Sequence, residues 1–352
     1  MCGTAGLFTG CDLGPCPLDL LRNSGSRAVL EDGRGEETHE YRSAFRTWFD
    51  RASVRSAPPP SLSTESERTV YFSPKHVPVA RHQLVSGLET DSFRWLLTQH
   101  LYRYLHFTAV LEQVVVNQAV VAIGNGSWGP ELPRQMRLDA HKIYCDEAYH
   151  SLVATELLEG VRRQTRIPPI QPAVPYFVKR LEHIVEGDKH LAPTLIRMLF
   201  VIVSETLISA TLTEIPDDPE VSLAVRTALR EHLSDEGRHH LFFASFLRYL
   251  WGALDPSERK HAGRIVPELI RCFLEPDVPA VEHELVSVGL SVDQAKEVVS
   301  DVFSDSIVNS HLGVTARKTV SYFAGLGVME DPETLWAFRR IGLLEPERAG
   351  AE

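Results

Sequence analysis

Seven side chains that can bind metal ions recur along the chain at spacings typical of helical metal sites. In chain order they are Glu112, Glu147, His150, Glu205, His232, Glu236 and His239. Because an α-helix advances about 100° per residue, Glu147 and His150 lie on the same side of their helix and can hold one metal ion. Glu236 and His239 can hold another, and His232 shares their face. Four carboxylates and three imidazoles on four helices predict a carboxylate-bridged pair of iron ions.

Two of the glutamates, Glu112 and Glu205, lie within apolar segments where no basic residue stands beside them in the sequence. Residues 101–123 are apolar on nearly every side around Glu112, which predicts a buried helix. A buried carboxylate without a partner is costly, whereas two ferrous ions would balance the charge of four glutamates. A metal centre therefore explains both residues. The charge near the middle of each segment argues against a membrane span.

The Glu-x-x-His spacing alone is a weak signal, because it occurs four times in the chain. We interpret residues 36–39 and 258–261 as surface sequences, since the first lies in a Gly-rich polar stretch and the second follows a helix-start signature. The other two share a longer Asp-Glu-x-x-His pattern that begins at Asp146 and at Asp235. Ligand histidines usually donate their second ring N–H to a carboxylate, so each aspartate could serve the histidine of the opposite helix. The alternative is a solvent-facing position for both aspartates.

The pattern of apolar residues predicts an all-α fold in which four helices carry the seven side chains. These helices are expected over residues 91–123, 131–164, 190–213 and 220–251. Additional helices over 256–273, 293–326 and 331–341 would pack around this four-helix bundle core. The prolines within 167–175 exclude a helix there and predict a long irregular connection.

Three parts are expected along the chain. Residues 1–69 form an N-terminal extension that is partly disordered, because it is rich in Gly and Ser and carries a Pro-rich linker over 56–66. One short amphipathic helix in this extension is expected around Tyr41, Phe45, Trp48 and Phe49. Residues 70–345 form the helical domain that holds the metal centre, and residues 346–352 form a tail.

Composition excludes several classes of protein. With 352 residues and 43% hydrophobic content, the chain can bury one large core. The net charge of −11 argues against a nucleic-acid partner, and the absence of a basic leader followed by an apolar stretch favours the cytoplasm. Of five cysteines, three lie within the first 16 residues at spacings that match no zinc or redox motif. Cys145 and Cys272 are expected to be small core residues.

The order Glu, Glu-x-x-His, Glu, His-x-x-x-Glu-x-x-His resembles that of the di-iron arylamine N-oxygenases. This family is typified by p-aminobenzoate N-oxygenase and the arylamine oxygenase of the chloramphenicol pathway. The additional histidine, here His232, distinguishes the family from most other di-iron proteins. Residues 71–79 also resemble a segment of the family, and the whole resemblance covers about residues 38–340. It implies a ferritin-like di-iron bundle, a homodimer, and iron ligation by the same seven residues.

The resemblance also implies an activity. The protein would be an oxidoreductase that uses dioxygen to convert an aromatic amine to a nitro group through hydroxylamine and nitroso stages, in secondary-metabolite (antibiotic) biosynthesis. Two iron ions would be the cofactors, and an electron-donor reductase would supply electrons. No catalytic residue beyond the metal ligands is expected. His232, as a third neutral imidazole, would add electron donation without adding charge.

Three residues are candidates for substrate binding. Tyr104 lies two helical turns before Glu112 and matches a pocket tyrosine of the family, and Phe107 stands where the family can hold an arginine for a benzoate carboxylate. This difference predicts a bulkier or uncharged aromatic amine, free or bound to a carrier protein. Arg317 could orient such a substrate, although a surface ion pair explains it better. An apolar cavity or simple core packing could equally use Val115, Val116, Ala119, Leu199, Phe200 and Ile202.

Other functions remain open at this point. The same oxidant could act on carbon, as in a di-iron C–H hydroxylase or desaturase. A non-oxygenase ferritin-like protein, for iron storage or for radical generation with Tyr144 or Tyr149, is a further alternative. His240 adjoins His239 but would point about 100° away from it, so we expect it to lie outside the metal ligands.

Overall fold

The computed structural model of the protein describes residues 40–56, 62, 69–212 and 217–345. The N-terminal cysteines, most of the expected linker and the C-terminal tail lie outside these residues. Within the described part, regular structure is helical, and the β-type pairing is an isolated bridge between Val70 and Val221. The predicted all-α fold is therefore confirmed for the described residues.

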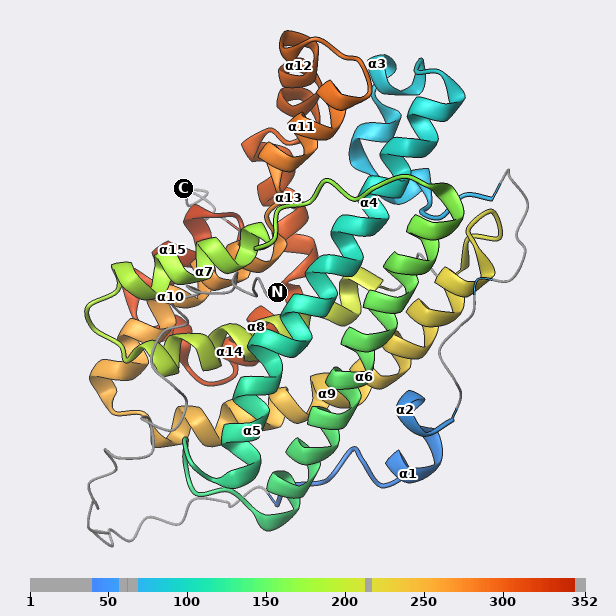
Figure 1. The fold of residues 1–352 in the computed structure, drawn as a ribbon. Coiled ribbons are helices and arrows are strands. Elements are labelled where there is room, and N and C mark those ends of the chain that lie inside the picture. Colours follow the sequence, from blue (N-terminus) through green and yellow to red (C-terminus); the bar gives the residue numbers. More distant parts are fainter. Residues whose placement is uncertain (1–39, 57–61, 63–68, 213–216, 346–352) are drawn as a thin grey trace, which may run out of the picture. The chain divides into compact units, whose positions relative to one another are not determined.

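The four helices that carry the candidate ligands form a ferritin-like bundle (Figure 1). The first is a continuous run of α4 (Thr90–Val110), the π-helical turn η4 (Leu111–Val116) and α5 (Asn117–Asn125). The second is α6 (Arg134–Thr165), which packs against this run and against α9 (Leu223–Ala253). The ring closes through α8 (Pro193–Leu212), which contacts both α9 and α5.

The first run is long and apolar enough, by length and composition alone, to cross a membrane over Thr90–Asn125. It nevertheless carries the buried carboxylate Glu112 at the π-helical turn and packs along α6. Core helices of globular proteins have the same composition, so this segment is accounted for by its place in the bundle.

Further helices surround the bundle, as the sequence predicts. They are shorter and more numerous than the three additional helices that were expected. They are η2 (Pro74–His76), η3 (Pro78–Arg81), α3 (Gln83–Ser86), α7 (Tyr176–Gly187), α10 (Pro256–Leu274), α11 (Val278–Ser287), α12 (Val292–Val302), α13 (Asp305–Thr315), α14 (Arg317–Ala324), η6 (Val328–Glu330) and α15 (Pro332–Arg340). α7 and α11 were not predicted, and the single helix expected over 293–326 is three helices. The chain leaves helical geometry at Phe303 and Ser304, before a new helix starts at Asp305.

The connection over residues 167–175 is irregular, as its prolines require. A buried glutamine on α4 holds it in place. The Gln99 side chain donates to the Pro168 carbonyl at 2.8 Å and accepts from the Ile170 amide at 3.2 Å. These bonds satisfy backbone groups that no helix pairs. They also fix the position of Pro172 and Pro175 beside the N-terminus of α7.

The segment over residues 41–56 belongs to the same compact unit as the described residues of the bundle. It holds two short helices, α1 (Trp48–Arg51) and α2 (Ser53–Ser56), in place of the one helix expected there. Phe45 and Trp48 are buried, and α2 contacts α6 and α9. Residues assigned from sequence to the N-terminal extension thus pack on the bundle beside the candidate ligands.

The two described cysteines differ in their surroundings. Cys272 is buried on α10 and donates to the Phe177 carbonyl, as expected of a core residue. The expectation for Cys145 is wrong, because its side chain is exposed on the outer side of α6. The next residue, Asp146, points inward instead, since successive residues on a helix are about 100° apart.

Candidate metal centre

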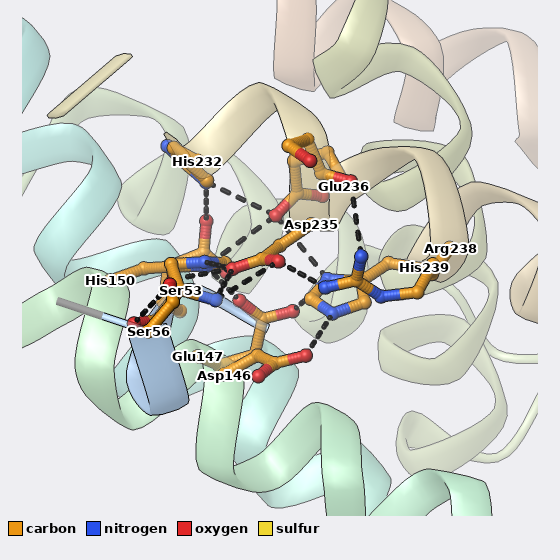
Figure 2. Close-up of polar contacts among 12 residues, drawn as sticks. Ser53, Ser56, Asp146, Glu147, His150, His232, Asp235, Glu236, Arg238 and His239 are labelled. Carbon is orange, nitrogen blue, oxygen red and sulfur yellow. Dashed lines mark hydrogen bonds and ion pairs between the residues drawn. The ribbon is translucent and has the colours of Figure 1, made fainter. Parts of the chain in front are cut away.

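The bundle brings the candidate ligands of α6 and α9 into direct contact (Figure 2). Glu147 lies between two imidazoles, with His239 Nδ1 2.8 Å from Oε1 and His150 Nδ1 2.8 Å from Oε2. Glu236 Oε1 lies 3.1 Å from His232 Nε2 and 3.3 Å from His239 Nδ1. The doubled Asp-Glu-x-x-His pattern therefore places both glutamates between the helices, within reach of the histidines of either one.

Glu112 and Glu205 complete the cluster from the two remaining helices. Glu112 Oε1 lies 3.6 Å from His232 Nε2, and Glu205 Oε2 lies 3.8 Å from His239 Nδ1. Both side chains are fully buried. Glu112 is the second residue of the π-helical turn η4. Such wider turns are rare and often mark functional sites, because they redirect side chains relative to a regular α-helix.

Two overlapping groups have the separations that a metal ion requires. His150, His232 and Glu236 offer ligand atoms within 4.8 Å of one another, and so do Glu147, Glu205, Glu236 and His239. Glu236 belongs to both groups, as a bridging carboxylate would. Glu112 falls outside both groups by this criterion, but its contact with His232 places it on the side of the first group.

The hydrogen bonds of the cluster are incomplete in a way that fits metal ions. Both carboxylate oxygens of Glu112, Glu205 and Glu236, and Oε1 of Glu147, are buried and make no hydrogen bond of regular geometry, although one oxygen of each glutamate lies within ion-pair distance of an imidazole. His232 Nε2 and His239 Nδ1 are equally without a hydrogen bond. Buried polar atoms are normally paired, and an unpaired charge in a core is strongly destabilising. Oxygen and imidazole donors gathered in this way suit iron.

In the absence of metal ions, several side chains of the cluster hold protons that bound metal ions would displace. Burial, reinforced by the charge of Glu147, raises the pKa of Glu112 to about 8. Burial and the charge of Glu236 likewise raise the pKa of Glu205 well above its usual value. Burial also opposes charge on His239, but the carboxylate of Glu147 holds the pKa of that imidazole well above its ordinary value. Metal-free, the site retains protons that metal binding would release.

Asp146 and Asp235 each contact the candidate ligand of the opposite helix, as the sequence predicts (Figure 2). Asp146 on α6 lies 3.2 Å from His239 Nε2, and Asp235 on α9 lies 3.1 Å from His150 Nε2. The Nδ1 atoms of both histidines therefore face the glutamates. A carboxylate on Nε2 fixes the tautomer and the orientation of the ring, which makes Nδ1 a better ligand. The alternative of solvent-facing aspartates is wrong, since both are fully buried.

The partners of these aspartates come from the segment before the predicted domain. The indole Nε1 of Trp48 donates to both oxygens of Asp146, at 2.9 and 2.8 Å. Asp235 accepts from the Ser53 backbone amide at 3.2 Å and from its hydroxyl, and it pairs with Arg238. The sequence indicated a short helix around Trp48 but gave no signal for these contacts.

His240 points away from the cluster, as expected. Its Nε2 lies 2.7 Å from the Tyr322 hydroxyl on α14. Of the tyrosines considered for a radical role, Tyr144 is exposed, and Tyr149 lines a small cavity that also contacts His150 and His232.

A cavity of about 910 Å³ lies on one side of α4 and has aromatic walls. Six phenylalanine and tyrosine residues line it: Phe72, Tyr104, Phe107, Tyr176, Phe177 and Phe273. The ring of Phe107 lies 4.6 Å from that of Phe177 and 5.6 Å from that of Phe273, between centroids. Tyr104 also lines the small cavity of about 30 Å³ beside His150 and His232. Tyr104 therefore stands between the aromatic cavity and the candidate metal centre.

Other residues proposed for the pocket lie elsewhere. Arg317 is exposed at the first residue of α14 and is not among the residues that line the aromatic cavity. The aromatic cavity is also not lined by any of the six apolar residues on η4, α5 and α8 that the sequence offered as wall residues. Leu199, Phe200 and Ile202 are fully buried, so core packing explains them.

Two comparisons agree with this geometry. The family model described as p-aminobenzoate N-oxygenase AurF matches residues 42–327, a span that holds all seven candidate ligands. The chain is 23% identical over 232 residues to the 4-aminobenzoate N-oxygenase of Streptomyces thioluteus, covering 65% of this chain and 68% of that protein. This protein therefore belongs to the p-aminobenzoate N-oxygenase AurF family.

Proposed function

We propose that this protein uses dioxygen at a di-iron centre to oxidise an aromatic amine to a nitro group through hydroxylamine and nitroso stages. As a member of the AurF family it is an oxidoreductase of the arylamine N-oxygenase class. The observation that carries the proposal is the convergence of four buried glutamates on three buried imidazoles, with carboxylate oxygens that make no regular hydrogen bond. Iron held there would supply the redox chemistry that activates dioxygen, which ordinary side chains do not provide.

The ligand assignment forms part of the proposal. Glu112, His150 and His232 would hold one iron ion, and Glu205 and His239 the other, with Glu147 and Glu236 contacting both sides. The distances support this division, since Glu147 lies 2.8 Å from imidazoles of both sides and Glu236 belongs to both metal-sized groups. With four carboxylates, such a site would be neutral around two ferrous ions.

We further propose an uncharged or bulky aromatic amine as the substrate, either free or tethered to a carrier protein. The aromatic walls around Phe107 fit an aryl ring, and pairs of offset or tilted rings are favourable. Three basic side chains also line the cavity: Lys75, Arg81 and Arg103. Arg103 is paired with the buried carboxylate of Glu284 and Lys75 with Asp218, so these two have less charge to offer to a benzoate carboxylate than the exposed Arg81.

The reaction defines what else the protein needs. Conversion of the amine to its hydroxylamine by one dioxygen releases one water and consumes two electrons and two protons. Those electrons come from outside the substrate, so an external electron donor is part of the proposal. A homodimer and a role in secondary-metabolite biosynthesis are also proposed, on the resemblance alone, and a cytoplasmic location is proposed from the sequence.

The test begins with metal content. Apoprotein incubated with ferrous iron is expected to retain two iron ions per chain, and a Glu205→Gln variant fewer. The reduced protein is then mixed with oxygen and a panel of free and carrier-bound aromatic amines, and products are identified by mass spectrometry. Hydroxylamine, nitroso and nitro products support the proposal. Two bound irons with products oxidised only at carbon would favour a C–H hydroxylase instead, and no iron binding would refute the site.

A further inference from the structure

The segment over residues 41–56 presents an exposed aromatic ring among exposed arginines, directly above a hydrogen-bonded route to the candidate metal centre. We name as the α1 face the exposed residues Arg42, Arg46, Phe49, Arg51 and Arg55. We propose that the α1 face docks an acidic iron–sulfur electron-transfer protein, and that its electrons reach the metal centre through Trp48 and Asp146. The proposal rests on the proposed function only in requiring a centre that accepts electrons.

The route runs inward from the surface through four side chains in contact. Phe49 is 64% exposed, and its ring lies against that of Trp48, with centroids 5.1 Å apart. Trp48 is only 7% exposed and donates its indole N–H to the fully buried Asp146 at 2.8 Å. Asp146 in turn contacts His239 Nε2 at 3.2 Å. Electrons tunnel more readily along bonded and hydrogen-bonded atoms than across empty space, so this chain is a suitable path.

The equivalent position on the opposite helix lacks such a path. Asp235, which contacts His150, is held by Ser53 and by Arg238. A hydroxyl, an amide and a guanidinium can orient a carboxylate, but none of them is redox-active. If orientation were the whole purpose, the smaller partners found at Asp235 would suffice at Asp146 as well. The indole at Asp146 therefore calls for a second role.

The charge of the α1 face differs from that of the whole chain. The protein carries a formal net charge of −11, yet residues 41–56 contain four arginines and one acidic residue, Asp50. Lys142 on α6 also approaches the Phe49 ring, 5.9 Å from its centre, but it is paired with the buried Asp139 and adds no net charge to the face. A local positive face on an acidic protein attracts an acidic partner and orients it, which speeds the encounter.

Phe49 stands at the centre of this positive charge. The guanidinium of Arg55 lies 6.0 Å from the ring centroid, on the same ring that Lys142 approaches. Aromatic residues and arginines are enriched at the centres of protein interfaces, where the ring supplies contact area at low entropic cost. Electron-transfer complexes are small and transient, so one exposed ring with a charged rim is an appropriate size.

The α1 face is separate from the aromatic cavity. The residues that line that cavity begin at Phe72 in the sequence and include none from the segment over 41–56. A carrier protein that delivers a tethered amine would have to reach the cavity, so the α1 face does not suit that occupant. An electron donor needs no access to the cavity, because its electrons travel through the protein.

The electron balance identifies the class of donor. Each docked donor with a reduced iron–sulfur cluster loses one electron, and one ferric ion becomes ferrous. Two encounters thus return a diferric centre to the diferrous form. Plant-type ferredoxins carry one electron at a low potential, which suits the reduction of a ferric site. An acidic [2Fe–2S] ferredoxin of this type is accordingly the probe.

The first experiment measures binding. Affinity of the iron-loaded protein for this ferredoxin is measured by titration calorimetry at 50 and 300 mM salt. We expect micromolar affinity that weakens at least tenfold with salt, and a further loss of at least tenfold in the triple variant R46E/R51E/R55E. The matched control is the triple variant R162E/R163E/R166E, which reverses three exposed arginines at the far end of α6 and should bind the probe normally. Equal binding by the triple variant and the wild-type protein would overturn the docking site.

The second experiment measures electron transfer by stopped-flow reduction of the diferric centre, without any amine. Trp48→Phe is expected to keep the affinity for ferredoxin and two irons, but to slow reduction at saturating ferredoxin at least tenfold. Reduced methyl viologen, a small cation with no need of the α1 face, should reduce the triple variant as fast as wild-type protein. Unchanged ferredoxin rates in both variants, or a wild-type protein that ferredoxin fails to reduce, would overturn the proposal. Failure to oxidise amines would leave these rates intact and would count only against the proposed function.

Discussion

Replacement of Asp146 by asparagine tests whether the aspartate contacts support metal binding. The two oxygens of Asp146 accept the Trp48 N–H, and Oδ2 also contacts His239 Nε2. Asparagine has one acceptor oxygen and one NH₂ donor, so in either orientation of the amide a donor faces a donor. The His239 ring is then held less firmly and loses the negative charge behind it.

The expected magnitude follows from similar contacts at other metal sites. Loss of such a partner lowers metal affinity about 10–100-fold, which corresponds to about 1.4–2.8 kcal/mol. The effect should fall on the iron ion bound to His239 and spare the one bound to His150, since Asp235 is unchanged. Competition with a ferrous chelator should therefore show one weakened and one normal site, where the wild-type protein shows two tight sites.

Asp139 provides the matched control, because it is another fully buried aspartate two turns earlier on α6. It accepts hydrogen bonds from Tyr41 at 2.9 Å, Gln135 at 2.9 Å and Lys142 at 2.8 Å, and contacts no candidate ligand. Asp139→Asn should lower the free energy of unfolding by about 1–3 kcal/mol and leave both iron affinities normal. If Asp146→Asn kept both affinities, or if Asp139→Asn weakened iron binding equally, the reasoning would be refuted.

Three further predictions concern single groups. Glu205→Gln should reduce iron content from two ions per chain towards one while leaving the melting temperature of the apoprotein at pH 7 nearly unchanged, because burial already favours the neutral form of Glu205; a large destabilisation would contradict this. The apoprotein should lose stability as the pH rises. The Glu112 carboxyl, with its pKa raised from 4.5 to about 8, contributes this loss between those two values, and the three histidines, whose pKa values are raised, contribute a further loss above their ordinary value of 6.5. Each such proton changes the free energy of unfolding by about 1.4 kcal/mol per pH unit, and melting curves that rise with pH would exclude this sign. Phe107→Arg should lower the KM for p-aminobenzoate relative to an uncharged aniline, as steady-state kinetics on both substrates would reveal; an unchanged ratio would remove Phe107 from substrate selection.

The sequence alone located the candidate ligands because their signal is local. A glutamate and a histidine three residues apart share a helix face whatever the rest of the chain does, so Glu147 and His150 could be paired before any fold was known. The repeated aspartate before each glutamate extended the same argument across two helices. Helix limits were also close, with 131–164 expected for the helix observed at Arg134–Thr165.

Contacts between distant segments had no such local signal. The bonds of Trp48 to Asp146 and of Ser53 to Asp235 join residues 98 and 182 positions apart. A single sequence shows that Trp48 belongs to a short amphipathic helix. It does not show which buried acceptor receives the hydrogen bond from the indole N–H. The π-helical turn at Glu112, which packs against α6 and α8, was equally invisible in the sequence.

The residues that line the cavity could not be identified from the sequence either. Phe72, Phe107, Phe177 and Phe273 come from four separate segments that only the tertiary fold brings together. The apolar residues of α8 were equally plausible wall residues from the sequence, and they are core instead. A run of apolar residues predicts burial, but burial against protein and burial against substrate leave the same pattern.

The two halves of the candidate centre are related by the repeated pattern on α6 and α9, and each half departs from this symmetry in its own way, the half at His150 and His232 most of all. His232 adds an imidazole beside Glu112, and Glu112 itself sits on the π-helical turn. The small cavity beside His150 and His232 is on this side too, and Tyr104 connects it to the aromatic cavity. The indole contact lies on the other side, at Asp146 and His239. Substrate approach and electron supply would thus use opposite halves of the centre, so that a bound amine does not obstruct the path of the electrons.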